Sequence, residues 1–408
     1  MSSPSQNLSF KDFNQSQKDW GLDFNFPKTK EEFWNFTSWK NLRQTDYKVT
    51  TEVFIFHSFD PETKKQTLTL SDDKYAQEGN SVALSSISLN ENYELKDNSF
   101  SLKLEFKAQS QMDPSVHFPG FFRNLASSKL PLLNLTLNSH NQSKIEVKFQ
   151  LKNTFLICKL EHQQDPKSEA QLHTEVNCLN PEAFVQLHHF FTVPDQAQLH
   201  HSHYLHPGSK SYQEFEFDQG QESEVKSLKL STRPDWERSH YLFTQQKKLA
   251  STHFKSLQIV NKKCFSELIA SVNHQDTEGM SDFQSKVIAT DQSKSSSRGR
   301  VLIDAKALQT NSNQQIRGLL LNENSELFVK PELEVFADDV KANHGAAVGP
   351  LDLDKMFYLM SRGLSKETAL KSIKEAFVKE LFTSSHPQSE ILFNKLNLDQ
   401  IWTQSLES

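Results

Sequence analysis

The chain has 408 residues, a formal net charge of −6 at pH 7 and a hydrophobic share of 36%, with 31 phenylalanines. A chain of this length can bury a sizeable core in two or three structural units, and its mild charge without a dense Lys/Arg patch argues against nucleic-acid binding. Only 11 glycines are present, and the chain lacks the GxxxxGK[ST], GxGxxG, GxSxG and HExxH motifs, so we expect no ATP hydrolysis by this chain itself.

Three cysteines (Cys158, Cys178 and Cys264) form no CxxC pair. Their odd number favours free thiols in a reduced compartment, and we expect them to be buried as small hydrophobic side chains. The first residues lack the basic and apolar regions of a signal peptide, and no apolar run is long enough to span a bilayer. The sequence therefore predicts a soluble, cytoplasmic protein.

Near the N-terminus, Thr29 is a candidate helix cap in front of an aromatic cluster, which predicts a small packed subdomain. The cluster contains Phe33, Trp34, Phe36 and Trp39. A turn into a short helix is expected over 119–126. Alternating apolar residues over 100–108 and 145–151 predict two half-buried strands.

From about residue 132 to 340, short alternating runs are separated by turn-forming residues, and no long amphipathic helix interrupts them. The runs include Phe215/Phe217, Leu228/Leu230, Leu257/Ile259, Val301/Ile303 and Leu327/Val329. This pattern suits a sandwich, a barrel or a solenoid, and no repeat of fixed period chooses between them. The Ser- and Lys-rich segment 281–300 is predicted to be a mobile loop or an eroded strand pair.

Helical spacing replaces the strand pattern after Gly349. Leu353, Phe357 and Met360 share one face of a short helix, which Gly363 can end. Ser365 is a candidate cap for a longer helix, and Pro387 separates that helix from a last one over 391–406. The apolar stripe of the longer helix is Leu370, Ile373, Phe377 and Leu381.

Histidines cluster between residues 188 and 206, namely His188, His189, His200, His201, His203 and His206. On a strand His201 and His203 would share a face, as two metal ligands do. No Cys, Asp or Glu stands at complementary ligand spacing nearby in the sequence, so we interpret the run as a surface-exposed edge. His344, directly before Gly345, is by itself most simply a structural histidine at a turn. Asp338 and Asp339 are adjacent on a strand and point to opposite faces, which favours a structural or interfacial role over acid–base catalysis.

The segment 330–349, with Ala-Asp-Asp-Val-Lys and His-Gly-Ala, resembles the C-terminal signature of the SufB/SufD family of Suf iron–sulfur cluster assembly proteins, and is closer to the SufD form. Residues 27–42 and the Arg-Gly tail at 362–363 resemble the family as well. The resemblance implies a mainly β fold: an N-terminal α/β subdomain (1–130), a central right-handed parallel β-helix (131–347) and a C-terminal helical domain (348–408).

The resemblance also implies a function. The chain would be a non-catalytic SufD-like scaffold of a SufBCD complex, with His344 at the interface with a SufB-like subunit, where a transient iron–sulfur cluster forms. The family often has Cys at the position of Ala342, so a thiolate ligand would come from the partner. A SufC-like ATPase would dock on Leu370, Ile373, Phe377 and Leu381.

Three alternatives remain open at this point. The chain could be a SufB-like cluster carrier, which its few cysteines oppose. It could be a non-catalytic β-helix interaction protein, which Ala342 favours. It could also be a β-helix carbohydrate-active enzyme with paired carboxylates, which the helical tail opposes.

Overall fold

The computed structural model describes residues 7–9, 46–49, 52–60, 62–73, 82–88, 92–96, 100–108, 131–382, 387 and 389–396. The predicted N-terminal helix and aromatic cluster, the resemblance at 27–42 and the predicted helix at 119–126 lie outside the described residues.

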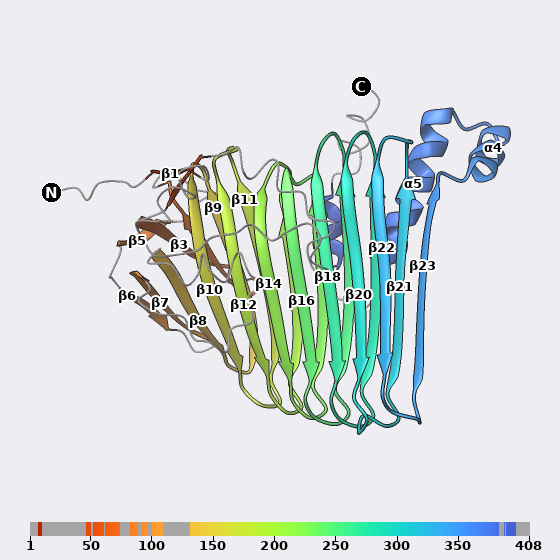
Figure 1. Cartoon of the computed structure of the whole chain (residues 1–408). Helices are drawn as coiled ribbons and strands as arrows, with labels where there is room; N and C mark the ends of the chain where they lie inside the picture. The colour runs from red at the N-terminus through yellow and green to blue at the C-terminus, as the bar shows by residue number, and fades with distance from the viewer. Residues whose placement is uncertain are drawn as a thin grey trace.

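Two long sheets face one another and form a parallel β-solenoid (Figure 1). Successive strands alternate between the sheets, so each coil contributes one strand to each sheet. Sheet A runs β8-β10-β12-β14-β16-β18-β20-β22, and sheet B runs β9-β11-β13-β15-β17-β19-β21-β23. All neighbouring strands from β8 or β9 onward are parallel. This arrangement confirms the predicted β-helix core and selects the solenoid among the three β architectures that suited the pattern.

The strands of the solenoid are close to ten residues long. Sheet A contains β8 (Pro131–Ser139), β10 (Thr154–Gln164), β12 (Phe184–Val193), β14 (Lys210–Gln219), β16 (Trp236–Gln245), β18 (Phe265–His274), β20 (Lys294–Ile303) and β22 (Glu326–Val335). Sheet B contains β9 (Gln142–Leu151), β11 (Glu169–Cys178), β13 (Gln198–Leu205), β15 (Glu224–Thr232), β17 (Ser251–Val260), β19 (Met280–Ala289), β21 (Asn311–Leu320) and β23 (Lys341–Pro350).

The segment 281–300 was predicted to be a loop or an eroded strand pair, and this prediction is wrong. β19 and β20 are full strands, each paired on both sides. Their serines point inward: Ser285 Oγ of β19 lies 2.8 Å from Ser297 Oγ of β20 and 2.9 Å from Ser256 Oγ of β17. Inside these coils, paired serine hydroxyls fill part of the interior. The alternating apolar residues that indicate a strand in a sequence are therefore absent from much of this segment.

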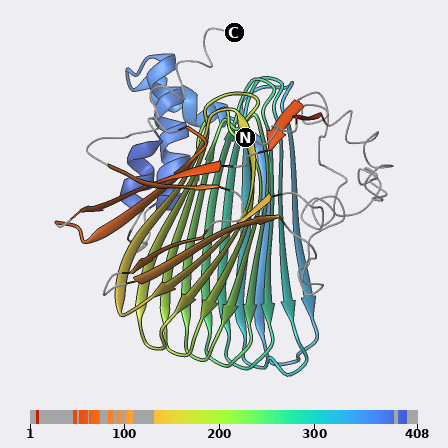
Figure 2. The same cartoon turned by 90° about the vertical axis from the view of Figure 1, so that its left-hand side faces the viewer.

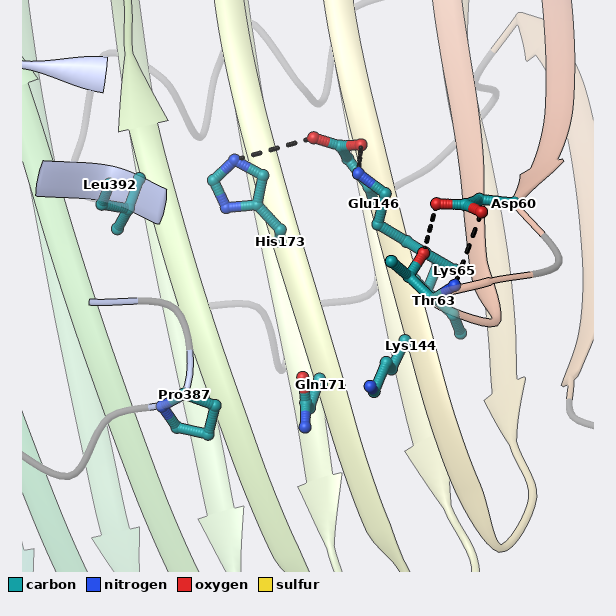
Figure 3. A pocket seen from close by; sticks show the side chains of 10 residues that line it. Asp60, Thr63, Lys65, Lys144, Glu146, Gln171, His173, Pro387 and Leu392 are labelled. Carbon is teal, nitrogen blue, oxygen red and sulfur yellow. Dashed lines mark hydrogen bonds and ion pairs between the residues drawn. The ribbon is translucent and has the colours of Figure 1, made fainter. Parts of the chain in front are cut away.

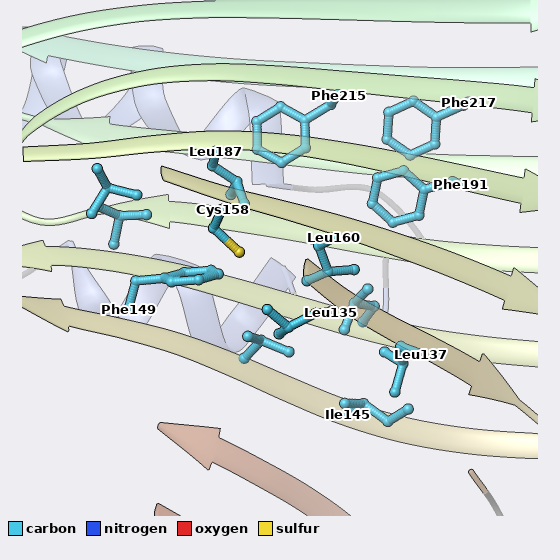
Figure 4. Close-up of a cluster of buried hydrophobic side chains, with 14 of the residues drawn as sticks. Leu135, Leu137, Ile145, Phe149, Cys158, Leu160, Leu187, Phe191, Phe215 and Phe217 are labelled. Atoms are coloured by element: carbon cyan, nitrogen blue, oxygen red, sulfur yellow. The ribbon is translucent and has the colours of Figure 1, made fainter. Parts of the chain in front are cut away.

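Apolar side chains fill the interior of the early coils (Figure 4). Aromatic rings stack from coil to coil there: Phe191 and Phe217 have centroids 4.2 Å apart, and Phe217 and Phe243 4.5 Å apart. Such pairs add about 0.5–1.5 kcal/mol each beyond their area burial. The apolar ladder therefore stabilises the register of consecutive coils.

The interior becomes polar in the middle coils. Lys229 Nζ pairs with Glu237 Oε1 at 2.7 Å, and both side chains are fully buried. Ser231, Ser239 and Ser266 donate hydrogen bonds of 2.6–2.7 Å to the same carboxylate. On β15 and β17, Leu228, Leu230, Leu257 and Ile259 belong instead to a cluster outside the solenoid that includes Val378 and Leu381 of the helical tail.

Further strands extend both sheets at the N-terminal end. β4 (Lys65–Ser71) pairs in parallel with β9 and antiparallel with β3 (Glu52–Asp60), and β5 (Val82–Ser88) pairs with β3. β7 (Phe100–Ala108) joins β8 and β6 (Asn92–Lys96), while β1 (Asn7–Ser9) pairs with β2 (Asp46–Val49). β7 and β9 confirm the two strands predicted at 100–108 and 145–151.

In the described part of the chain after β23, three helices lie to one side of the solenoid (Figure 2): α4 (Leu353–Ser361), α5 (Lys366–Phe382) and α6 (Ser389–Lys395). Asp352 caps α4, since its side chain accepts from the backbone N–H of Lys355. Ser365 caps α5 as predicted, by accepting from the backbone N–H of Thr368. Among the described residues, none of the helices combines the length and apolarity needed to cross a membrane.

Candidate functional site

The solenoid has an open end at β22 and β23. In the described part of the chain each of these strands pairs with one neighbour alone, β20 or β21. The outer edge of each strand therefore presents backbone groups for pairing. Phe336, just after β22, is 64% exposed, and Phe328, Val335 and Val348 are also exposed. Apolar side chains beside open strand edges are typical of a surface that another chain covers.

His344 lies on β23 at this open end. It is in register with Gln314 of β21, which is in register with Phe283 of β19. Neighbours in a parallel ladder share a face, and Gln314 and Phe283 point into the solenoid. His344 therefore continues an interior row, yet it is exposed because no further coil covers it.

Gln314 lies directly behind His344 in this row. Its side chain is 1% exposed, and neither its amide nitrogen nor its amide oxygen has a hydrogen-bond partner among the residues that the structure describes. Gly299 of β20 makes the space for it: a Cβ at Gly299 would lie 1.8 Å from Gln314 Nε2 and 2.4 Å from Phe283 Cε1. A buried amide without hydrogen bonds lowers the stability of the fold. The layer directly behind His344 therefore contains a polar side chain in spite of this cost.

Charged groups surround the open end on the outer face of sheet A. Arg300 donates two hydrogen bonds to Glu334, of 3.0 and 2.9 Å, and these lower the pKa of that carboxyl. A cavity of about 470 Å³ next to this pair is lined by residues that include His240, Ile269, Arg298 and Glu332. Burial lowers the pKa of His240 to about 4, with Arg238 contributing, so its imidazole is neutral at physiological pH.

All three cysteines are buried, as predicted. Burial raises the pKa of the Cys178 thiol to about 12 and that of Cys264 to about 11, and raises the pKa of Cys158 well above its ordinary value. Thiolates are the form that binds metals, so these three groups are poor ligands where they stand. β23 itself carries no cysteine, and Ala342 stands two residues before His344.

The histidine-rich run was predicted to be a surface-exposed edge, and this is wrong for most of it. His188, His189, His200, His201 and His203 are all buried, and His206 is half-buried. His201 and His203 do share a face, as the strand pattern predicted, but that face is the interior. His188 lies near Glu214 and Glu216, at 3.7 and 3.0 Å. The carboxylates come from the next strand of the sheet, 26 or more residues away, so sequence proximity could not find them.

The residues predicted to dock an ATPase are placed differently from one another. Leu370 and Ile373 are half-buried. Leu381 is fully buried, and Phe377 packs beside it against the wall of sheet B. Lys286 Nζ donates to the backbone oxygen of Phe377 at 2.6 Å and holds this part of α5 in place. The exposed apolar face of the helical tail lies on α4 instead, at Leu353, Phe357, Tyr358 and Met360.

Asp338 and Asp339 lie in the turn between β22 and β23, where both are exposed. The backbone N–H of Gln309 donates to the backbone oxygen of Asp339 at 2.6 Å. The pair is on a turn, not on a strand as the sequence pattern suggested, and it closes the last coil.

Comparison with known proteins adds evidence of another kind. Residues 161–377, more than half of the chain, match the family described as the SufBD core domain of the SUF system for FeS cluster assembly. An iron–sulfur cluster assembly SufBD family protein of Synechocystis is 30% identical over 163 residues, which are 40% of this chain and 36% of that protein. The iron–sulfur cluster assembly protein SufD of Escherichia coli is 38% identical over 96 residues, 24% of this chain and 23% of that protein.

The chloroplastic protein ABCI7 of Arabidopsis thaliana is 40% identical over 93 residues, 23% of this chain and 19% of that protein. The matched segments thus span little more than a third of these relatives' length at most.

Proposed function

The chain belongs to the SufBD family of iron–sulfur cluster assembly proteins, and on that premise we propose that it is a SufD-like scaffold subunit of a SufBCD complex. It would help to build and transfer nascent iron–sulfur clusters at an interface with a SufB-like subunit and perform no turnover of its own. Residues 1–130, 131–347 and 348–408 would serve as N-terminal subdomain, β-helix core and docking domain. Its cytoplasmic location stays a prediction.

The observation that carries this proposal is the open end of the solenoid. A terminal coil with unpaired edges and exposed Phe336 is incomplete as a free surface, because solenoid coils bury their faces against neighbours. A second β-helix of the same family, approaching end to end, would continue both sheets. We propose that the SufB-like subunit fills this place.

His344 would then lie between the two subunits. Imidazole is a good ligand for iron, and a mixed set of imidazole and thiolates can hold an iron–sulfur cluster. Since Ala342 offers no thiol and the three cysteines of this chain are buried, the thiolates would come from the partner. In this proposal the cluster is cargo, and His344 is the one ligand that this chain supplies from its open end.

A SufC-like ATPase would dock on the helical tail. Because Leu381 and Phe377 pack on the solenoid, we assign the contact to the exposed face of α4 with the half-buried Leu370 and Ile373 beside it. ATP-driven movement of the docked subunits would pull on α5, which Lys286 and Arg317 tie to β19 and β21 through Glu380. Those strands lead to β23, so the movement would strain the interface at His344.

Affinity purification of the tagged chain from native extract tests the proposal. Co-purification of a SufB-like and a SufC-like protein in defined stoichiometry is the expected result. Recovery of the chain without either partner, while it remains folded by circular dichroism, would contradict the scaffold role and favour the free-standing interaction protein that Ala342 kept open.

A further inference from the structure

A group of possible metal ligands, Glu146, His173 and Glu175, lies on the outer face of sheet B, many strands away from the open end. Figure 3 shows Glu146 and His173. Glu146 projects from β9, and His173 and Glu175 project from β11. His173 is in register with Glu146 on one side and with Ser202 of β13 on the other. All three side chains of the group are more than nine-tenths buried. The register of β9 and β11 therefore places the His173 imidazole between the carboxylates of Glu146 and Glu175.

The spacing of these groups suits one metal ion. One ligand atom from each of the three residues lies within 4.8 Å of the others. His173 Nε2 is 2.8 Å from Glu175 Oε1 and 3.9 Å from Glu146 Oε1. Ligands bonded at about 2.0–2.2 Å around a tetrahedral ion are roughly 3.4 Å apart, so small side-chain adjustments would suffice.

Neighbouring groups orient the three ligands. Without an ion, His173 Nε2–H donates to Glu175 Oε1 at 2.8 Å and Nδ1 accepts from Ser202 Oγ at 2.6 Å. An ion at Nε2 would displace that proton, and Nδ1–H would then donate to the Ser202 hydroxyl. Lys65 and Thr67 donate to Glu146 Oε2 at 2.8 and 3.0 Å, which leaves Oε1 facing His173. Such outer bonds are typical of metal-binding histidines and carboxylates.

A cation already occupies this group. The ammonium of Lys395, at the end of α6, pairs with Glu175 Oε1 and lies 3.5 Å from His173 Nε2. It also lies 5.6 Å from the centre of the Tyr204 ring. A cavity of about 330 Å³ lined by Lys65, Glu146, His173 and Leu392 leads to the group beside α6. Lys65 and Lys395 balance the two carboxylates, so a doubly charged ion could enter only if Lys395 left.

We propose that Glu146, His173 and Glu175 bind a divalent transition-metal ion, and that the ion replaces the Lys395 ammonium and so loosens α6, which then keeps only its apolar contacts with the wall of the solenoid through Leu392. One imidazole with two carboxylates suits Zn²⁺, Mn²⁺ or Fe²⁺ better than Mg²⁺, which prefers all-oxygen sites. The inference uses no feature of the open end, and is independent of the role proposed for His344.

Zn²⁺ binding to the full-length chain, followed by calorimetry, tests the ligands. The wild type is expected to bind one equivalent, with Mg²⁺ giving no signal. His173→Ala and the isosteric Glu175→Gln should abolish binding, and Ser202→Ala should weaken it by about tenfold. His200→Ala, a buried histidine on β13 of the same sheet, is the matched control and should bind as the wild type does.

Lys395→Ala tests the exchange. Removal of the competing ammonium should tighten Zn²⁺ binding by about tenfold or more. In the wild type, Zn²⁺ should speed hydrogen exchange of the α6 amides, and in Lys395→Ala exchange should be fast with or without the ion. Absence of Zn²⁺ binding in both proteins, or its loss on His188→Ala in place of His173→Ala, would overturn the site. Binding that leaves α6 exchange unchanged would overturn the replacement of Lys395.

Discussion

His344 and Gln314 occupy neighbouring positions in one interior row, and they differ only in that a further coil covers the second. The same direction of the side chain that buries Gln314 thus exposes His344 at the end of the solenoid. The last coil of the fold therefore presents this histidine to a partner, and no special loop is needed.

Gly299→Ala is expected to disturb the layer behind His344. The added Cβ would meet Gln314 Nε2 at 1.8 Å and Phe283 Cε1 at 2.4 Å, so the amide must move or the strand must shift. Overpacking of this kind costs about 1–3 kcal/mol in the free energy of unfolding. Chemical denaturation measures the loss. Gly345→Ala is the control, because a Cβ there meets nothing within 4 Å; equal stability of the two variants would contradict the account.

Glu237→Gln is expected to be strongly destabilising. It leaves the Lys229 ammonium inside the solenoid without its counter-charge, which typically costs about 3–5 kcal/mol. The double variant Lys229→Met/Glu237→Gln should recover much of that loss, because it removes the orphaned charge. Denaturant unfolding of the single and double variants measures both.

The exposed pair Lys294–Glu326 gives the matched control for this experiment, since both side chains are about half exposed. Glu326→Gln should leave stability nearly unchanged. If Glu237→Gln lowered the free energy of unfolding as little as Glu326→Gln, the buried ion pair would not contribute measurably to stability.

Acid should destabilise the folded chain through its buried histidines. Burial lowers the pKa of His162 and of His274 from 6.5 to about 4. Between these values the unfolded chain binds protons that the folded chain does not, so stability is complete above pH 6.5 and falls as the pH drops towards 4. Each group contributes a slope of up to about 1.4 kcal/mol per pH unit. His274→Gln should flatten the measured pH profile of unfolding, and an unchanged slope would contradict this assignment.

Phe357→Ser on α4 and Leu381→Ser on α5 should separate docking from folding. Phe357 is 73% exposed, so its change should leave the thermal midpoint unaltered and reduce capture of the SufC-like ATPase. Leu381 is fully buried, and its change should lower the midpoint through lost packing. If a folded Phe357→Ser chain still bound the ATPase, α4 would not be the docking surface.

Much of the β architecture was predictable from local pattern. The alternation at 100–108 and 145–151 marks β7 and β9, and the helical spacing after Gly349 marks α4 and α5. The solenoid repeat could not be detected in the sequence because its coils differ in length. Val185 pairs with Ser211, 26 residues on, while Lys294 pairs with Glu326, 32 residues on. A search for one fixed period cannot detect such a repeat.

A weaker repeat signal was present at the turns before sheet B. There, residues with positive φ are followed by small buried ones, as at Gln196–Ala197, Glu222–Ser223 and Leu249–Ala250. Such turns usually attract glycine, and this chain uses other residues, so the sequence offered no glycine pattern to follow.

The polar interior was the hardest feature to predict. On β15 the residues Ser227, Lys229 and Ser231 point inward while Leu228 and Leu230 pack outside under the helical tail. Alternation alone gives two faces without saying which is inside. For the same reason the histidine-rich run was interpreted as exposed. The carboxylate partners of His188, and Glu146 beside His173, could be found only once the strands were in register.

The central claim is that His344 serves cluster formation at the open end. The most direct measurement is bound iron and sulfide after anaerobic reconstitution of the complex with its SufB-like and SufC-like partners. Wild type, His344→Ala and Asn343→Ala would be compared, since Asn343 is an exposed neighbour on the same strand that points to the opposite face. We expect all three proteins to assemble with the partners and only His344→Ala to fail to hold the cluster. Full cluster content in His344→Ala would contradict this claim.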